Sequence, residues 1–378
     1  MRIAVNLIPL EGLQGIETFA ENVIQAIAEK YPDVELFLIL HKNSPHFFKE
    51  FSYAQVKNFF LSTPRLGKLS EVIMQQFCIY PLLRELRPDL LFSPSPFMPA
   101  FFNRNVVVIH DCAYDRFREE LPNTWRRVFI RGTYFLAKLR ALKIITVSEF
   151  SKRELIELYK INPDRIDVIY EAAPKLPMVT DEVQQKTLKK FSLGDSPYFF
   201  YVGNMRPRKN LPRMIEAFRL FSENYPGYKF VIAGKIDKRF SEPLQVVEEA
   251  GIKDRVIFTG FVTQEEKVAL YKGSLSLFFC SLYEGFGLPV LESQSLGVPV
   301  ITSSASSLPE VAGSGALYAD PLDAENMAKR LEAIVLNDKL RAELTQKGFE
   351  NLNRFSWEKT AENLFSIFHG LVHSGSSC

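Results

Sequence analysis

The chain has 378 residues, of which 47% are apolar and 24% charged, so two or three domains with sizeable cores are expected. That composition excludes disorder as the main state and a disulfide-dependent miniprotein. Lys and Arg number 46 against 44 Asp and Glu, and the resulting net charge of +2 provides no global field for wrapping nucleic acid. A histone-like or acidic-tail role does not fit, and no nucleic-acid partner is expected.

The N-terminal sequence MRIAVNLIPLEG lacks a signal-peptide cleavage pattern, and no run approaches about 18 uninterrupted apolar residues. The sequence therefore predicts a cytosolic protein that does not span a membrane, with peripheral contact to the inner membrane face as the alternative to free solution. The four cysteines lie far apart, without C-x-x-C or a His at ligand spacing: Cys78, Cys112, Cys280 and Cys378. We expect ordinary thiols, no metal site and no cofactor.

Short β-rich apolar runs alternate with amphipathic helical patterns along the first 170 residues. Strands are predicted at 2–8, 34–40, 90–92, 105–110, 143–148 and 166–170, and helices at 16–30, 69–86 and 124–142. Because β-α-β alternation calls for a buried parallel sheet, this half predicts one α/β lobe that ends near Tyr170. Residues 171–196 turn to Pro, Lys and polar residues without an apolar period, which is typical of a connection between lobes.

The same alternation restarts after this connection and predicts a second α/β lobe. Strands are predicted at 198–203, 228–234, 255–260, 275–280 and 298–302, with helices at 211–224, 243–250, 263–271 and 289–296. Three further helices, near 324–336, 339–351 and 357–371, close the chain. Open α/β sheets bind ligands outside the carboxyl ends of their strands, so we expect the chemistry in a cleft between two such lobes.

The most informative stretch is SLYEGFGLPVLESQSLGVP, at residues 281–299, where a turn follows a predicted strand. Pro289 suits the first turn of a helix and Gly297 suits its exit, so Glu284 lies on the turn and Glu292 in the first helical turn. In one interpretation the acid complements the helix dipole and the glycines make a tight turn. In the other, backbone N–H groups at the helix start face a diphosphate while Glu292 accepts hydrogen bonds from a ribose diol. Spacing alone favours neither.

A second stretch, YVGNMRPRKNLPRMIEAF at residues 201–218, places three cations after a strand-ending glycine: Arg206, Arg208 and Lys209. Such a group is often only a solvated loop. Facing a cleft, it would form a clamp for diphosphate charge.

Candidate residues of the first lobe carry weaker signals. Gly12 and Gly15 lie between the first strand and a helix, but they match neither G-x-G-x-x-G nor G-x-x-x-x-G-K-[ST], which weakens the nicotinamide and P-loop interpretations. His110 follows a predicted strand, where a lone histidine is more often structural. In the stretch TVSEFSKREL, Ser151 and Glu154 fit a capping box, while Ser148 ends the preceding strand.

The stretch Thr124–Lys143, TWRRVFIRGTYFLAKLRALK, mixes six basic residues with aromatic residues. It could be a basic face attracted to anionic lipid or to a lipid-diphosphate acceptor. A solvated face over a buried apolar stripe is the favoured interpretation.

These segments resemble the retaining glycosyltransferases of family 4, the "group 1" transferases with the GT-B fold. Glu284-Gly285-Phe286-Gly287-Leu288-Pro289, ending in Glu292, is similar to the family's E-x7-E motif, and the Arg208-Lys209-Asn210 loop is similar to its R-K-N phosphate segment. Asn204 stands where some members have an arginine directly after the strand-ending glycine. The arginine role therefore falls to Arg206 or Arg208, and we favour Arg208 together with Lys209.

The resemblance implies an acceptor-side Rossmann-like domain at 1–175, completed by a C-terminal helix at 357–378, and a donor-binding Rossmann-like domain at 196–356. It implies His110 at the transferred sugar and the Gly15 loop near the donor phosphate. The implied catalytic residues are His110, Glu284, Lys209 and Arg208. The implied donor-binding residues are Gly15, Arg206, Arg208, Lys209, Gly285, Phe286, Gly287, Leu288 and Glu292.

The implied activity is retaining, metal-independent transfer of a hexose from a nucleoside-diphosphate sugar to a glycan or lipid-linked acceptor in polysaccharide biosynthesis. Mannose or glucose is favoured as the sugar and GDP-mannose as the donor, and the absence of any Asp-x-Asp agrees with metal independence. A nucleotide-sugar epimerase and a catalytically inactive nucleotide-sugar-binding homologue remain as alternatives. A two-lobed binding protein of periplasmic type would need an export signal, which is not visible.

Overall fold

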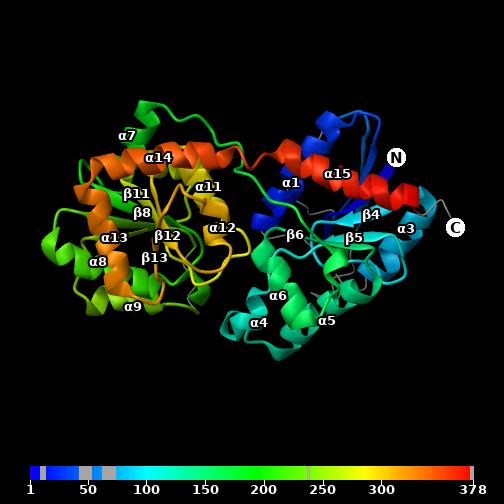
Figure 1. Ribbon diagram of the computed structural model, residues 1–378, viewed down its shortest axis with the longest axis horizontal. Coiled ribbons are helices and arrows are strands. Elements are labelled where there is room, and N and C mark those ends of the chain that lie inside the picture. The colour runs from blue at the N-terminus through cyan, green and yellow to red at the C-terminus, as the bar shows by residue number, and fades with distance from the viewer. Residues whose placement is uncertain (9–13, 42–52, 62–73, 236, 238, 375–378) are drawn as a thin grey trace. The chain divides into compact units, whose positions relative to one another are not determined.

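The computed structural model describes residues 1–8, 14–41, 53–61, 74–235, 237 and 239–374, and the chain forms two compact α/β units (Figure 1). The first unit contains Met1–Cys112, Leu121–Glu171 and Ser356–Cys378, and the second contains Ala113–Glu120 and Ala172–Phe355. Ala113–Glu120 follows a strand of the first unit in sequence and yet packs with the second. The boundaries therefore differ from the expected ones at this segment and at residues 172–195.

A seven-stranded parallel sheet forms the centre of the first unit, in the order β3-β2-β1-β4-β5-β6-β7. Its strands are β1 (Arg2–Asn6), β2 (Glu35–His41), β3 (Val56–Leu61), β4 (Leu90–Ser93), β5 (Asn105–Val108), β6 (Lys143–Thr146) and β7 (Ile166–Val168). The sequence patterns predicted all of them except β3. That strand lies at the sheet edge and none of its residues is buried, so it lacks the continuous apolar run of an inner strand.

The helices of the first unit are α1 (Gln14–Lys30), the π-helix η3 (Met74–Cys78), α3 (Ile79–Leu86), α5 (Thr124–Arg140), α6 (Glu149–Tyr159) and α15 (Trp357–Ser374), with a 3-10 turn, η5 (Pro163–Arg165). The last helix returns to this unit, because the Phe365 ring stacks on Tyr31 with centroids 3.8 Å apart and Phe368 packs on Phe92. Gly12 and the first residues of the predicted helix 69–86 lie outside the described residues.

Helix α6 begins one turn earlier than the sequence suggested. Its cap is Ser148, whose side chain accepts a hydrogen bond from the Ser151 backbone N–H at 3.0 Å. The capping box predicted at Ser151 and Glu154 is therefore wrong, because Ser148 already satisfies the orphan N–H group there.

The second unit is built on a six-stranded parallel sheet in the order β10-β9-β8-β11-β12-β13. Its strands are β8 (Tyr198–Val202), β9 (Lys229–Ala233), β10 (Val256–Gly260), β11 (Ser276–Phe279), β12 (Val300–Ser303) and β13 (Leu317–Ala319). Its helices are α4 (Ala113–Arg116), α7 (Asp181–Lys190), α8 (Leu211–Asn224), α9 (Glu242–Glu249), α10 (Gln264–Gly273), α11 (Leu288–Ser295), α12 (Leu308–Ala312), α13 (Ala324–Leu336) and α14 (Asp338–Leu352), with 3-10 turns η4 (Arg118–Glu120) and η6 (Pro207–Lys209).

Part of the predicted connection 171–196 is helical. Helix α7 packs on α10, and Lys190 forms an ion pair with Glu266 across the contact. The helix has only a small buried surface, with Thr187 its one buried residue. Its apolar period was consequently too weak to be detected.

The strand ends of the second sheet bring two loops together. Strands β8 and β11 are hydrogen-bonded neighbours and run parallel, so the loops after them, 203–210 and 280–287, leave the same edge of the sheet. Close packing at this edge requires glycine, because a Cβ on Gly234 would lie 1.8 Å from the Gly203 carbonyl oxygen.

Among the described residues, no helix has the length and apolarity that a membrane crossing requires.

Candidate functional site

Hydrogen bonds from the Asn210 side chain and from one backbone N–H fix the loop that carries the basic residues. Asn210 adopts a left-handed conformation, with φ 62°, and its side-chain amide donates to the Cys280 carbonyl at 3.0 Å and to the Pro321 carbonyl at 2.7 Å. The Leu282 backbone N–H donates to the Arg208 carbonyl at 2.8 Å. The bonds to Cys280 and from Leu282 tie the turn η6 to the loop after β11, so the two sequence motifs are joined independently of their charged side chains.

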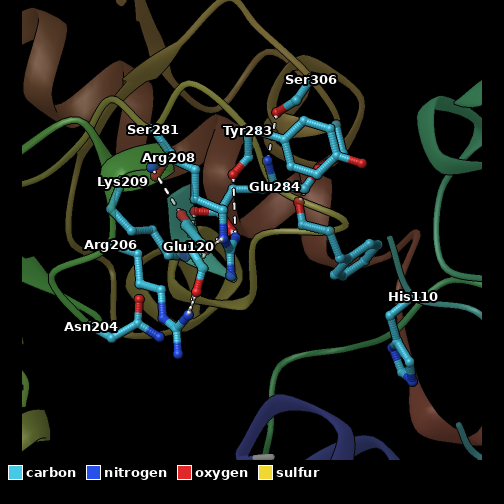
Figure 2. A network of polar contacts seen from close by, with 12 residues as sticks. His110, Glu120, Asn204, Arg206, Arg208, Lys209, Ser281, Tyr283, Glu284 and Ser306 are labelled. Carbon is cyan, nitrogen blue, oxygen red and sulfur yellow. Dashed lines mark hydrogen bonds and ion pairs between the residues drawn. The ribbon is translucent and has the colours of Figure 1, made fainter. Parts of the chain in front are cut away.

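The cations of the first motif meet the first glutamate of the second (Figure 2). The Lys209 ammonium donates to both carboxylate oxygens of Glu284, at 2.6 and 2.8 Å. Arg208 donates from Nη1 to Glu284 Oε2 at 3.3 Å. The structure therefore brings Glu284 to Arg208 and Lys209, which precede it by 76 and 75 positions in the sequence.

The Lys209–Glu284 ion pair is buried, so burial and pairing shift the pKa of each group in opposite directions. Lys209 is 8% exposed and Glu284 is 6% exposed. Burial alone would raise the pKa of Glu284, but the adjacent Lys209 and Arg208 outweigh it and hold the pKa below its usual value. Burial lowers the pKa of Lys209, and Glu284 restores only part of the difference. Glu284 is therefore a carboxylate at neutral pH, suited to fixing cations and unsuited to donating a proton.

Glu120 is a member of the cluster that sequence reasoning missed. The Arg208 backbone N–H donates to Glu120 Oε1 at 3.1 Å, and Arg208 Nε donates to Oε2 at 3.3 Å. Arg206 donates to the Glu120 carbonyl at 3.4 Å and lies 3.8 Å from its carboxylate. Burial raises the pKa of Glu120, against the opposing effect of Arg208 and Arg206. No motif marks this residue, because its role depends on the segment 113–120 packing with the second unit.

Three cations pair with two carboxylates in this cluster, Arg206 and Arg208 with Glu120, and Arg208 and Lys209 with Glu284. Arg208 is bonded on one side by Glu120 and on the other by Glu284, so its guanidinium is held in place before any ligand arrives. Arg206 has a more exposed side chain, and its hydrogen bond and ion pair go to Glu120. Of the two arginines, Arg208 is therefore the one built into the buried cluster.

The turn between Glu284 and helix α11 is held by a run of serines that the sequence reasoning did not use. The Glu284 backbone N–H donates to Ser306 Oγ at 3.1 Å, and Ser307 Oγ bonds the carbonyls of Glu284 and Phe286 at 2.9 and 2.7 Å. Gly287, with φ 115°, precedes the first residue of α11, Leu288. In the sequence, the Ser-rich run SSASS at 303–307, directly after the predicted strand at 298–302, could have indicated these hydrogen bonds.

Within this turn, Gly285 and Phe286 lie between Glu284 and the helix start. The Phe286 ring is buried and packs against Phe355 with centroids 5.8 Å apart. This leaves the backbone of the turn, rather than the aromatic ring, as the part suited to a polar ligand. Pro289 has no N–H and the Val290 N–H donates to the Gly287 carbonyl at 3.0 Å, so the attraction of this helix start for an anion depends on the helix dipole.

Glu292 lies in α11 and is held by two residues of α10. Its Oε1 accepts from Lys267 Nζ at 2.7 Å and its Oε2 accepts from the Tyr271 hydroxyl at 3.0 Å. Neither Lys267 nor Tyr271 was predicted. A carboxylate offers about four acceptor positions, so each oxygen keeps capacity for a further donor such as a ribose hydroxyl.

His110 and Gly15 belong to the first unit, whereas all the other predicted site residues belong to the second. His110 Nδ1 lies 3.2 Å from Glu171 Oε1, and Nε2 lies 3.1 Å from the Pro94 carbonyl. Which ring nitrogen donates and which accepts depends on the tautomer of His110. Gly15 is exposed in α1, with open space around it.

Two parallel α/β units, with a basic cluster beside a helix start at the strand ends of the second, place the chain in the class of two-lobed Rossmann-like proteins. The family described as "Glycosyl transferases group 1" matches residues 183–351, and "Glycosyltransferase Family 4" matches residues 13–173. The chain belongs to the group 1 glycosyltransferase family, and its fold is GT-B. The predicted fold class and family are confirmed.

Relatives and solved structures agree with this assignment. The chain is 31% identical to the O-antigen chain mannosyltransferase B of Escherichia coli, over 76% of this chain and 75% of that protein. It is 27% identical to the O-antigen chain mannosyltransferase RfbU of Salmonella typhimurium, over 79% of this chain and 81% of that one. Anabaena Alr3699/HepE in complex with UDP-glucose has a TM-score of 0.74 at 17% identity, with 100% of each chain covered. The last comparison concerns the fold alone.

Proposed function

We propose that this glycosyltransferase moves a hexose, favoured as mannose, from a nucleoside-diphosphate sugar to a glycan or lipid-linked acceptor in polysaccharide biosynthesis, with retention of anomeric configuration. The observation that carries the proposal is the buried cluster of Arg208, Lys209 and Glu284 beside the start of α11. Its two adjacent cations, Arg208 and Lys209, suit a ligand with two phosphates. The names of the two O-antigen relatives support mannose and a polysaccharide product.

In this proposal the donor diphosphate binds Arg208 and Lys209. When phosphate oxygens approach, the two side chains exchange part of their contact with Glu284 for charge-assisted hydrogen bonds to the ligand. Glu284 and Glu120 keep the cations oriented throughout, so little reorganisation is needed as charge builds on the leaving phosphate. Glu292 accepts hydrogen bonds from the ribose, and the positive end of the α11 dipole contributes to the anion site.

Retention without a covalent enzyme intermediate fits the pairing of Glu284 with two cations. Glu284 is bonded to two cations and has a lowered pKa, so it is a weak base and a poor nucleophile. The proposed base is the departing phosphate, which takes the acceptor hydroxyl proton on the face that it leaves. The cations at Arg208 and Lys209 supply the charge stabilisation that other transferases obtain from a divalent metal, and the chain contains no Asp-x-Asp.

Of the first-unit candidates, His110 is proposed to contact the transferred sugar and the Gly15 loop to approach the donor phosphate. His110 would have to exchange its contact with the Pro94 carbonyl for a sugar hydroxyl. The proposed location is the cytoplasm, where nucleotide sugars are made available to such enzymes.

Binding of nucleotide sugars is tested by thermal unfolding with GDP-mannose, UDP-glucose and ADP-glucose. A ligand at a hundred times its Kd stabilises the folded chain by about 2.7 kcal/mol. We expect GDP-mannose to raise the unfolding midpoint most. A chain indifferent to all three would contradict the proposed donor class.

A product assay separates transfer from the alternatives. With GDP-mannose and a lipid-linked glycan acceptor, the product anomer is read by NMR, with and without EDTA. Retained configuration that is insensitive to EDTA supports the proposal. Free epimer formed without acceptor would instead show an epimerase, and donor binding without turnover on any glycan acceptor would show an inactive binding homologue.

A further inference from the structure

Helix α5, labelled in Figure 1, belongs to the first unit and exposes large apolar side chains. Trp125 is 83% exposed, Phe135 is 54% exposed and Leu139 is 58% exposed. Val128 and Phe129 are also exposed. A single exposed apolar residue needs no explanation, but five on one 17-residue helix do.

These residues form one stripe on the side of the helix away from its buried residues, and at one end of it the Phe129 ring stacks on Phe97 of the same unit with centroids 5.9 Å apart. Val128 and Phe129 follow Trp125 at helical spacing of three and four, and Leu139 follows Phe135 by four, so the side chains line up along one side. The buried face carries Tyr134 and Ala137, which belong to the core beneath the helix, together with Thr133. The favoured sequence interpretation, a solvated face over a buried apolar stripe, holds for the side with Tyr134 and Ala137, but it did not predict the second, exposed apolar stripe.

Basic residues flank the exposed stripe on both sides. With 100° per residue, Arg126 and Arg140 fall along one edge of the stripe, and Arg131 and Lys138 fall along the other. Residues 121–148 contain no Asp or Glu at all. The stripe continues onto the loop before β5, because Arg140 Nε donates to the Ala100 carbonyl and the neighbouring Phe101 is exposed.

An apolar stripe between two basic edges matches the chemistry of an anionic bilayer surface. Trp, Phe and Leu side chains enter the boundary between headgroups and acyl chains, while Lys and Arg remain level with the negative headgroups. A second copy of the chain is a poorer match. A two-fold interface made of this face would bring its basic edges close together, without an acid between 121 and 148 to neutralise them.

We propose that the face formed by Trp125, Val128, Phe129, Phe135 and Leu139, with its basic edges, docks the protein onto an anionic phospholipid membrane. This inference goes beyond the proposed function, because it needs neither donor nor acceptor. If a lipid-linked acceptor is the substrate, docking would hold the enzyme at the surface that presents it.

Intrinsic fluorescence gives a direct readout, because the chain has only two tryptophans. In a Trp357→Phe variant of the full chain, Trp125 is the sole tryptophan. Titration with phosphatidylglycerol vesicles should shift its emission to shorter wavelength and protect it from acrylamide. Pure phosphatidylcholine vesicles should give a much smaller effect, and added salt should reverse the binding.

Sedimentation with the same vesicles measures the contribution of the face in the otherwise unchanged chain. At about a fivefold change in affinity for each positive charge near the membrane, Arg126→Glu with Arg131→Glu should weaken binding by about thirtyfold or more. Phe135→Ser with Leu139→Ser should weaken it by at least about tenfold. The matched controls lie on the second unit: Lys186→Glu with Lys189→Glu, on exposed positions of α7, and Phe261→Ser, at an exposed aromatic. Neither should change binding, and circular dichroism checks that every variant is folded.

Three results would overturn the proposal. One is the absence of binding to phosphatidylglycerol vesicles, and another is an equal loss in the α7 control. The third is a dimer that Phe135→Ser with Leu139→Ser dissociates in analytical ultracentrifugation, which would make the face a subunit interface. Loss of vesicle binding with unchanged transfer to a soluble acceptor analogue would support docking, and donor-binding failure with intact vesicle binding would contradict only the proposed function.

Discussion

Replacing Glu284 by glutamine tests the electrostatics of the buried cluster most directly, because the shape of the side chain is kept and its charge is lost. The Lys209 ammonium loses the carboxylate that accepts both of its hydrogen bonds. Breaking one side of a buried ion pair costs about 3–5 kcal/mol. Burial already lowers the pKa of Lys209, so loss of its proton limits the penalty, and we expect the lower end of that range.

A loss of about 3 kcal/mol corresponds to about 6–12 °C in the unfolding midpoint of a unit of this size. Calorimetry of the wild type and the variant measures this shift. The matched control is Glu248→Gln, which removes the carboxylate of a highly exposed ion pair with Lys253 and should leave the midpoint unchanged.

Nucleoside diphosphate should partly rescue the variant, since its phosphate oxygens supply the negative charge that glutamine lacks. We expect saturating ligand to stabilise Glu284→Gln by about 1 kcal/mol or more beyond the wild type, or about 2–4 °C. Equal ligand shifts in both proteins, or a midpoint within 2 °C of the wild type without ligand, would refute the reasoning.

The sign of the pH dependence follows from the lowered pKa of Glu284. Its contribution to the free energy of unfolding is full above its ordinary pKa of about 4.5 and is lost as the pH falls through the lowered native value. The wild type should therefore lose stability on the acid side, and the Glu284→Gln variant should show a shallower acid slope in the same calorimetric series. An unchanged slope would place the acid sensitivity elsewhere.

Three further predictions concern neighbouring residues. Lys209→Ala should lower kcat/KM for donor by about a hundredfold or more, since one preorganised cation is lost, whereas Lys189→Ala on α7 should match the wild type in initial-rate assays. A Lys209→Ala variant with wild-type rates would contradict the proposed binding of the donor diphosphate by Lys209. Burial raises the pKa of Glu120, so folding takes up a proton between pH 4.5 and the raised native value, and stability falls as pH rises through that window. Glu120→Gln should remove that part of the pH dependence in urea titrations, and persistence of the slope would argue against it. Gly287→Ala should destabilise the second unit by about 1 kcal/mol or more, because alanine is strained at φ 115°, and a stability equal to the wild type in the same titrations would contradict this.

Much of the fold was readable from the sequence because buried parallel strands are short continuous apolar runs. The run YFFYV became β8, with its first four residues buried, and the helix predicted at 324–336 is α13 with the same bounds. The elements that escaped prediction have few buried residues or few residues at all. The edge strand β3 and the helix α7 are of the first kind, and the three-residue strand β13 is of the second.

The sequence alone determined the family, the order of the elements and the motif residues of the second unit, since Arg208, Lys209, Glu284 and Glu292 lie beside glycine and proline signals that local backbone geometry requires. Only the tertiary structure decided which charges neighbour one another. Glu120 reaches Arg208 across 88 positions of sequence, and Lys267 reaches Glu292 across 25. It also decided which side of α5 is covered. Apolar periodicity marks a stripe on a helix, but whether that stripe is buried depends on what the rest of the chain places against it.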